Sequence, residues 1–417
     1  MKKIVVSLFL VCMMLLNAEG YTYEVFKTDN SQIPSNQVFD VMVADQDVKW
    51  ICTSNGLAVY DNVNWTTYNT SNSGLPNNIV RRVVQDSEGL YWVGTNSGLA
   101  SFDGSVWTVY NQENSPIPHN WVYGLAVDSQ NRLWMATYGG LACKSGTVWT
   151  VYTTSNSQLP ANLCHRVAVA ENDVIWASSY GGGIVKIENG GITSYDNTNS
   201  GVPFNLTSSI AVDSNNDVWF GTFSPSGLTK FDGNEWLNYN SQNSSLPASN
   251  ILDLDFDDLG NLWICTEYSG LYEMKTNGEW GVYTTNTTGV TFNTIMGIDF
   301  GSDNSVYVAG DFGLVKMIPD PIEINETVPS VSSLTNYPNP FNPVTTISFN
   351  LNFAEDIELN IYNSKGEIVQ NLAYGKFDNG LHSVTFNGID LSSGLYFAVL
   401  NAKLSGIKET TRLALLK

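Results

Sequence analysis

The feature that most constrains the fold is a segment that recurs seven times at a nearly fixed spacing. One copy, residues 86–104, contains Trp92 and the Gly98-Leu99 step. Successive copies of its aromatic residue lie 42 to 44 residues apart, the other six being Trp50, Trp134, Trp176, Trp219, Trp263 and Tyr307. A period of this length indicates a repeat architecture, and that decides the fold before any local motif is considered.

Each repeat divides into four short strands separated by turn signals. In the second repeat, the strand-like segments are Ile79–Gln85, Leu90–Thr95, Leu99–Phe102 and Trp107–Tyr110, and Asp103-Gly104 is a hairpin signal. No segment shows the i, i+3, i+4 apolar stripe of an amphipathic helix, which argues against a helical solenoid. Four-stranded units at this period are typical of β-propellers, so the chain is predicted to be all-β and to form a seven-bladed β-propeller.

The fourth, outermost strand of the repeat has six copies for seven repeats, and the last repeat lacks it. It occurs first as Trp65-Thr-Thr-Tyr68, but the seventh repeat stops at Ile318-Pro319. Tyr23-Glu-Val-Phe26 precedes the first repeat and aligns with the missing copy. We therefore expect the N-terminal strand to complete the last blade, because this arrangement removes an exposed sheet edge. Steps such as Leu75-Pro76 suit the crossovers between blades, since proline has no N–H donor for a strand ladder.

Taken together, three patterns carry a family resemblance. Leu-Pro-x-Asn, Asp-x-x-Gly-x-x-Trp-x-Gly-Thr-x-x-Gly-Leu and Phe-Asp-Gly resemble the two-component-regulator propeller repeat over residues 21–318. The resemblance implies the periplasmic sensor part of a hybrid sensor kinase. The sequence shows no membrane helix, kinase core or receiver, so we expect only the extracytoplasmic sensor module.

The N-terminus predicts an exported protein. Two lysines precede an apolar run that ends near Leu16, and Ala18-Glu19-Gly20 is a small-x-small cleavage site, so residues 1–20 read as a signal peptide. A lipoprotein anchored through Cys12 is the alternative. No other stretch is apolar for the roughly 20 residues that a bilayer requires, so we expect no membrane span.

The C-terminal part loses the repeat period. Residues 319–333 read as a semi-extended linker, and residues 334–417 contain short strands that predict a small immunoglobulin-like β-sandwich. Tyr337-Pro-Asn-Pro-Phe-Asn-Pro343, Ser393-Gly-Leu-Tyr396 and the final Leu-Leu-Lys resemble the type A sorting domain of the type IX secretion system. This resemblance implies export through the periplasm to the cell surface or medium, with the secretion machinery as a partner. It commonly implies removal of the tail as well.

Composition and motifs exclude several function classes. The net charge of −21 argues against a nucleic-acid partner, since phosphate binding needs clustered Lys and Arg. No HExxH, GxSxG or phosphate-binding loop is present, and we predict no cofactor, no metal and a monomer. The mature cysteines show neither metal-ligand spacing nor a CxxC pair, so we interpret them as structural and leave one disulfide open: Cys52, Cys143, Cys164 and Cys265.

Acidic residues gather in the turns between the first two strands of the blades. They are Asp45, Asp86, Asp128, Asp213 and Asp257. Aspartate suits such turns because its carboxylate accepts hydrogen bonds from nearby backbone N–H groups. We interpret these residues as turn formers, with a turn-bound calcium as the alternative.

A ligand site is predicted on one face of the disc. Because strands alternate in direction, the crossovers between blades and the turns between second and third strands share a face. The candidate ligand-binding residues on this face are Arg81, Arg82, Trp121, Tyr123, Tyr138, His165, Arg166, Tyr180, Phe223, Tyr268 and Phe312. Aromatic rings can stack on sugars, and arginine can bind carboxylate or sulfate through two hydrogen bonds. In the alternative interpretation, the aromatic residues pack between blades and the arginines pair with Asp40 or Asp253.

Three functions therefore remain open. The first is recognition of a poly- or oligosaccharide by a secreted or surface-bound propeller. The second is a protein–protein or adhesion scaffold at the cell surface. The third is a lyase or hydrolase acting on an acidic glycan through His165 with Tyr123, Arg81 and Arg166, although the sequence shows no acid–base partner for this histidine.

Overall fold

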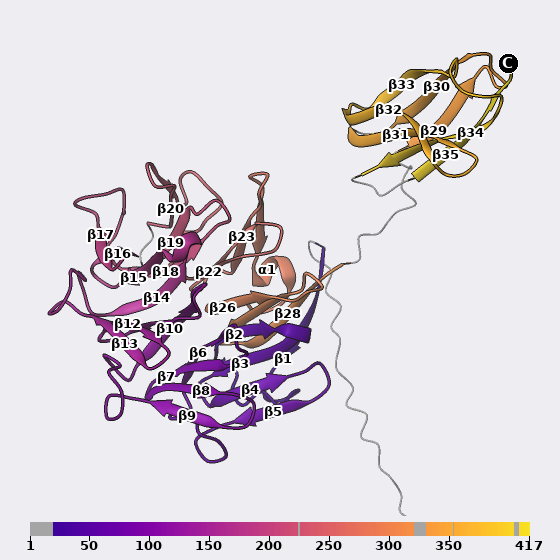
Figure 1. Ribbon diagram of the computed structural model, residues 1–417. Helices are drawn as coiled ribbons and strands as arrows, with labels where there is room; N and C mark the ends of the chain where they lie inside the picture. The colour runs from indigo at the N-terminus through magenta and orange to yellow at the C-terminus, as the bar shows by residue number, and fades with distance from the viewer. Residues whose placement is uncertain (1–19, 224–225, 321–330, 353, 404–407) are drawn as a thin grey trace, which may run out of the picture. The chain divides into compact units, whose positions relative to one another are not determined.

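The computed structural model describes residues 20–223, 226–320, 331–352, 354–403 and 408–417 (Figure 1). The chain divides into two compact units, Met1–Asp320 and Pro321–Lys417, which are described separately below. The predicted signal peptide, with Cys12, falls almost wholly outside the described residues. Within the described ranges, no helix has the length and apolar character needed to cross a membrane.

The first unit consists of seven four-stranded antiparallel sheets, the blades, each built of strands A to D in that order. The A strands are β2 (Val38–Ala44), β6 (Val80–Gln85), β10 (Val122–Val127), β14 (Cys164–Val169), β18 (Thr207–Val212), β22 (Ile251–Phe256) and β26 (Ile295–Phe300). The B strands are β3 (Val48–Thr53), β7 (Tyr91–Thr95), β11 (Leu133–Thr137), β15 (Ile175–Ser179), β19 (Val218–Thr222), β23 (Leu262–Thr266) and β27 (Val306–Gly310). The A strands of adjacent blades contact one another all the way round, β26 against β2 included, so the A strands surround a central channel.

The outer half of each blade follows the predicted pattern. The C strands are β4 (Gly56–Tyr60), β8 (Gly98–Phe102), β12 (Gly140–Ser145), β16 (Gly183–Glu188), β20 (Leu228–Phe231), β24 (Leu271–Met274) and β28 (Gly313–Pro319). The D strands are β5 (Trp65–Tyr68), β9 (Trp107–Tyr110), β13 (Val148–Tyr152), β17 (Gly191–Tyr195), β21 (Trp236–Tyr239), β25 (Trp280–Tyr283) and, for blade seven, β1 (Tyr21–Phe26). Three short helical turns complete this unit: η1 (Asp45–Asp47), η2 (Glu171–Asp173) and α1 (Thr285–Thr288).

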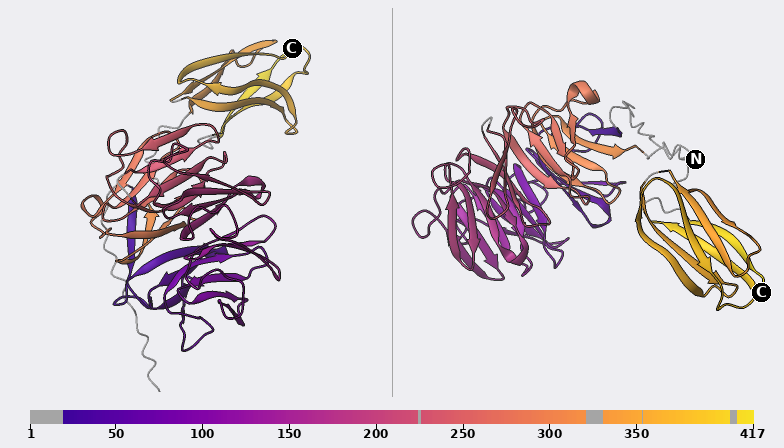
Figure 2. Two further views of the ribbon diagram at one scale, coloured as in Figure 1. Left: turned by 90° about the vertical axis from the view of Figure 1, so that its left-hand side faces the viewer. Right: turned by 90° about the horizontal axis from the view of Figure 1, so that it is seen from above.

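The ring closes through the N-terminal strand, as predicted. β1 pairs antiparallel with β28, from Tyr21 opposite Pro319 to Phe26 opposite Leu314. Figures 1 and 2 show this indigo strand beside the orange strands of blade seven. The ring of Tyr21 also lies edge-on against Trp263 of blade six, with centroids 6.4 Å apart. The segment that leads into blade one is therefore joined to blade seven by backbone hydrogen bonds, and the edge of β28 is covered by β1.

The repeated small residues and glycines are packing requirements. A Cβ on Gly94 of β7 would lie 2.9 Å from Val122 Cγ1, at the start of the next blade, so the position two residues after the repeat tryptophan must be small. Cys52 and Cys265 occupy it in blades one and six and are buried and unpaired, as are Cys143 and Cys164. Gly98 has φ +130°, and a Cβ there would lie 2.5 Å from Tyr110 O, so the turn between B and C needs glycine.

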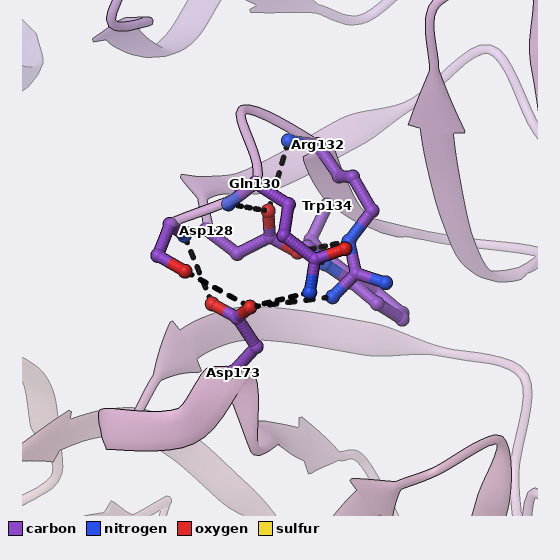
Figure 3. Close-up of polar contacts among 6 residues, drawn as sticks. Asp128, Gln130, Arg132, Trp134 and Asp173 are labelled. Carbon is purple, nitrogen blue, oxygen red and sulfur yellow. Dashed lines mark hydrogen bonds and ion pairs between the residues drawn. The ribbon is translucent and has the colours of Figure 1, made fainter.

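The A–B turns of four blades, on one face of the disc, share a hydrogen-bond arrangement. In blade three the Asp128 carboxylate accepts bonds from Trp134 Nε1 (2.8 Å), Arg132 N (2.9 Å) and Arg132 Nε (2.5 Å) (Figure 3). Asp173 of blade four accepts bonds from Gln130 Nε2 (2.7 Å) and from the backbone of the same turn. These carboxylates therefore tie the turn to its own tryptophan and to the next blade. The other Asp–Trp pairs are Asp86–Trp92, Asp213–Trp219 and Asp257–Trp263, at 2.9 to 3.0 Å.

The second unit is a small β-sandwich. One sheet contains β29 (Val331–Tyr337), β30 (Val344–Leu351) and β33 (Gly380–Asn387). The other sheet contains β32 (Ile368–Phe377), β31 (Glu355–Asn363), β34 (Gly394–Ala402) and β35 (Lys408–Leu415). Side chains such as Phe349 of β30, Ile361 of β31 and Leu413 of β35 fill the space between them.

The predicted linker, 319–333, lies mostly outside the described residues. Its two ends are strand, since Pro319 ends β28 and Val331–Ser333 begins β29. β29 pairs with β30, so these residues belong to the sandwich.

Candidate functional site

One position of the repeat forms the rim of the central channel. In every blade the A–B register shifts just after the first residue of the A strand, which marks a β-bulge at the next residue. A bulged residue is left out of the ladder and its side chain is re-aimed, here toward the channel axis. The seven residues at this position are Phe39, Arg81, Tyr123, His165, Ser208, Leu252 and Met296.

These seven side chains line one cavity of about 290 Å³, here called the mouth. Arg166, Phe223, Glu267 and Thr294 complete its lining. Phe223 and Glu267 follow B strands, so the B–C turns lie at this end of the channel, as expected. The predicted candidates Arg81, Tyr123, His165, Arg166 and Phe223 all meet here.

The next residue of the A strands closes the channel beneath the mouth. Arg82 Nη1 lies 3.0 Å from Asp253 Oδ2 and 3.4 Å from Asp40 Oδ1. Arg166 Nε lies 3.1 Å from Asp253 Oδ1. We call Asp40, Arg82, Arg166 and Asp253 the ionic floor. It joins blades one, two, four and six across the axis, and its aspartates are only 1% and 2% exposed.

Charge in the floor and the channel below is not evenly balanced. Burial opposes ionisation of Asp253, but the contacts with Arg82 and Arg166 outweigh it and lower its pKa. Among the described residues Asp40 forms an ion pair with Arg82 alone, and burial raises its pKa to about 7. Two residues further along the A strands, burial raises the pKa of Asp255 to about 8 and that of Asp299 to about 6. The charge of Asp299 adds to the upward shift of the pKa of Asp255.

Arg81 differs from the two floor arginines. Its Nε donates a hydrogen bond to Asn96 Oδ1 (2.9 Å), and its guanidinium lies 4.4 Å from the ring centroid of Phe39 and 5.7 Å from that of Tyr123. Among the described residues, no carboxylate forms an ion pair with it. Burial lowers the pKa of Arg81, but a guanidinium stays charged at neutral pH. The mouth therefore contains one cation without a counter-ion.

Aromatic rings extend from the mouth over blades three to five. This aromatic patch comprises His119, Trp121, Tyr123, Tyr138, His165, Tyr180 and Phe223. Ring centroids are 5.4 Å apart for Trp121–Tyr138 and 5.0 Å for the stacked pair Tyr123–His165. Trp121, Tyr138 and Tyr180 are 37 to 47% exposed. Burial and the nearby arginines lower the pKa of His165 to about 4, so its imidazole is neutral at pH 7.

Three predicted candidates lie elsewhere. Arg82 belongs to the ionic floor, where it pairs with Asp253 and Asp40, as the alternative interpretation had it. Phe312 lies in the B–C turn of blade seven as expected, but it is 6% exposed and packs on Phe292 in the core of that blade, so its ring is covered. Tyr268 is 75% exposed, with φ +64°, and neither lines the mouth nor joins the aromatic patch.

Several lining residues were not among the candidates. Ser208, Leu252 and Met296 occupy the same repeat position as Arg81 in blades five, six and seven. An alignment of all seven repeats at this position would have identified them. His119 lies in the crossover between β9 and β10. Its Nδ1 accepts a hydrogen bond from Trp121 N (2.9 Å), which places it beside Tyr138.

Comparisons with known proteins bear on both units. Residues 74–97 and 116–139 match the family described as two component regulator propeller, and residues 335–413 match the secretion system C-terminal sorting domain. No curated protein matches the chain.

Several solved structures are similar. One is the extracellular domain of the putative hybrid two component system BT3049 from B. thetaiotaomicron (TM-score 0.62, 19% identity, 95% of this chain and 57% of that one). Another is PorZ, an essential surface component of the type-IX secretion system of Porphyromonas gingivalis (0.57, 16%, 92% and 60%). A third is virginiamycin B lyase from Staphylococcus aureus (0.59, 15%, 72% and 99%).

At these identities the similarity establishes the fold. This chain spans less than two thirds of the length of the first two structures. Taken with the matched segments, the chain carries two-component-regulator propeller repeats followed by a type IX secretion sorting domain, which indicates export to the cell surface or medium.

Proposed function

We propose that this protein recognises a poly- or oligosaccharide outside the cell through the mouth and the adjoining aromatic patch. The observation that carries the proposal is the patch itself. Three of its rings, Trp121, Tyr138 and Tyr180, are exposed beside a cavity that contains an unpaired cation. Grouped exposed aromatic side chains mark interaction sites, and their faces suit the apolar faces of sugar rings.

The chemistry of the mouth fits a sugar better than a purely apolar ligand. His165 is neutral, and Glu267 and Thr294 also line the cavity, so hydroxyl groups would find both donors and acceptors. Ligand sites typically combine apolar walls with a few polar groups in this way.

A glycan array probed with the full chain tests the proposal. We expect binding to one class of glycan and its loss in the double variant Tyr138→Ala/Tyr180→Ala, because both exposed rings are removed. Tyr374→Ala is the control, since this tyrosine is also exposed (68%) but lies in the sandwich.

Two results would contradict the proposal. A blank array combined with capture of one surface protein through the same two tyrosines would favour a protein ligand. One similar propeller, YCF48, was solved with a bound peptide. Cleavage of the bound glycan during incubation would instead favour the enzyme hypothesis.

A further inference from the structure

The mouth is closed at its inner end. Beneath it the ionic floor crosses the channel axis through the contacts of Arg82 and Arg166 with Asp253. The cavity of about 290 Å³ is at the small end of the roughly 300–1,000 Å³ that ligand sites occupy. A polymer therefore cannot thread through the channel, and only the end of a chain fits inside.

Arg81 is positioned to bind a carboxylate. Its Nε is held by Asn96, and its guanidinium plane is flanked by Phe39 and Tyr123. Within the described ranges, its two Nη groups donate to no protein atom. A guanidinium held in this way presents a planar pair of donors that matches the two oxygens of a carboxylate.

The overall charge limits how acidic the ligand can be. The chain carries a net charge of −21, which repels a long polyanion. Glu267 also lines the mouth, but it belongs to the B–C turn of blade six and accepts a hydrogen bond from Asn250, whereas Arg81 belongs to blade two. One carboxylate directed toward blade two is therefore the anion that this cavity accommodates.

We infer that the mouth takes the terminal residue of a glycan end-on and that Arg81 binds a carboxylate on that residue. The inference rests on the proposed function, and it adds both the class of sugar, an acidic one, and the part of the chain that is recognised.

The test is calorimetric titration of the full chain with four matched trisaccharides. One is a neutral galactose trisaccharide, and in the other three a galacturonic acid replaces the first, the middle or the last unit. We expect one of the two end-substituted sugars to bind about tenfold tighter than the neutral one, because a hydrogen-bonded charge pair is added. The middle-substituted sugar should bind within about twofold of the neutral one, because only the terminal unit enters the mouth and its carboxylate alone meets Arg81.

Variants of Arg81 and Glu267 separate charge from shape. Arg81→Gln should abolish the preference for the acidic end yet keep the weak binding of the neutral sugar, and Arg81→Lys should retain only part of the preference because it loses the planar donor pair. Glu267→Gln should strengthen binding of the acidic sugar alone. Arg412→Gln, which removes an equal charge from an exposed position of the sandwich, should change nothing.

The outcomes distinguish the inference from the proposed function. Equal binding of neutral and acidic sugars, unchanged in Arg81→Gln, would refute the inference and leave the proposed function intact. Equal preference for middle and end substitution would refute end-on recognition. Acid-specific binding that survives Tyr138→Ala/Tyr180→Ala would support Arg81 and contradict the role of the patch. If none of the four sugars binds while the array identifies a glycan without a carboxylate on either terminal residue, the inference is wrong and the proposed function stands.

Discussion

The two faces of the propeller are built from the same repeats but differ in how they vary. On the A–B turn face, the hydrogen bond that the tryptophan Nε1 donates to the aspartate carboxylate recurs in four blades with nearly the same length, 2.8 to 3.0 Å. At the mouth, the bulged position of the A strand holds a different residue type in each of the seven blades. The difference teaches that repetition reflects packing, because every blade must fit its neighbours, whereas departure from the repeat marks the surface on which a ligand can be recognised.

The largest effect is expected on the turn face. Asp128→Ala removes the acceptor for Trp134 Nε1 and Arg132 Nε and should lower the free energy of unfolding by about 3 kcal/mol, because buried donors lose their partner. Denaturant unfolding followed by tryptophan fluorescence measures the propeller, since all 12 tryptophans lie in it. Asp128→Asn keeps one acceptor oxygen and should lose less. Weakened glycan binding in a folded Asp128→Ala protein would contradict the assignment of the A–B turn face to packing and of the mouth face to recognition.

The next effect is a pH dependence that originates in the channel. The pKa values of Asp40, Asp255 and Asp299 are raised by burial to about 7, 8 and 6, so the folded state retains protons that the unfolded state has released above about pH 4. The stability of the propeller should therefore fall as pH rises from 5 to 8. Asp255→Asn should flatten this slope in unfolding measured across that range. An unchanged slope would show that Asp255 is ionised throughout.

A smaller effect concerns a blade that lacks the repeated aspartate. Blade one has Ala44 at this position, and the buried Trp50 Nε1 has no hydrogen-bond partner in the part of the chain that the structure describes. Ala44→Asp supplies an acceptor and should add about 1 kcal/mol to the free energy of unfolding. Ala44→Asn should add part of this, and a loss of stability in both variants would mean that η1 holds the turn away from the tryptophan.

The smallest effect is expected at Tyr268. It occupies a B–C turn like Tyr138 and Tyr180, yet its ring joins neither the patch nor the mouth. Tyr268→Ala should change glycan affinity by less than about twofold, because few contacts are removed. An effect as large as that of Tyr138→Ala would extend the site to blade six.

The repeat frame predicted the architecture well because it encodes packing. The punctuation of each repeat located the four strands, and the unpaired Tyr23-Glu-Val-Phe26 predicted the closure of the ring. The sandwich was predicted from its strand spacing, but β29 began inside the expected linker because its pairing with β30 is a long-range contact without a local signal.

The site was predicted less completely, because local turns and bulges decide where a side chain points. The spacing of the repeats does not reveal these directions. Phe312 is buried because the crossover before blade seven lacks the usual proline and contains α1, and Phe292 of this crossover packs on it. Arg81 and Arg82 are adjacent in sequence, yet the β-bulge sends one to the mouth and the other to the ionic floor. Only the coordinates separate these two roles.

The central claim is that recognition belongs to the face where the repeats differ. The most direct test measures the dissociation constant of the array-selected glycan for two folded variants, Tyr138→Ala/Tyr180→Ala and Asp128→Ala. Loss of binding in the first, with binding unchanged in the second despite its lower stability, is the predicted result. Unchanged binding in the first together with loss in the second would contradict the account.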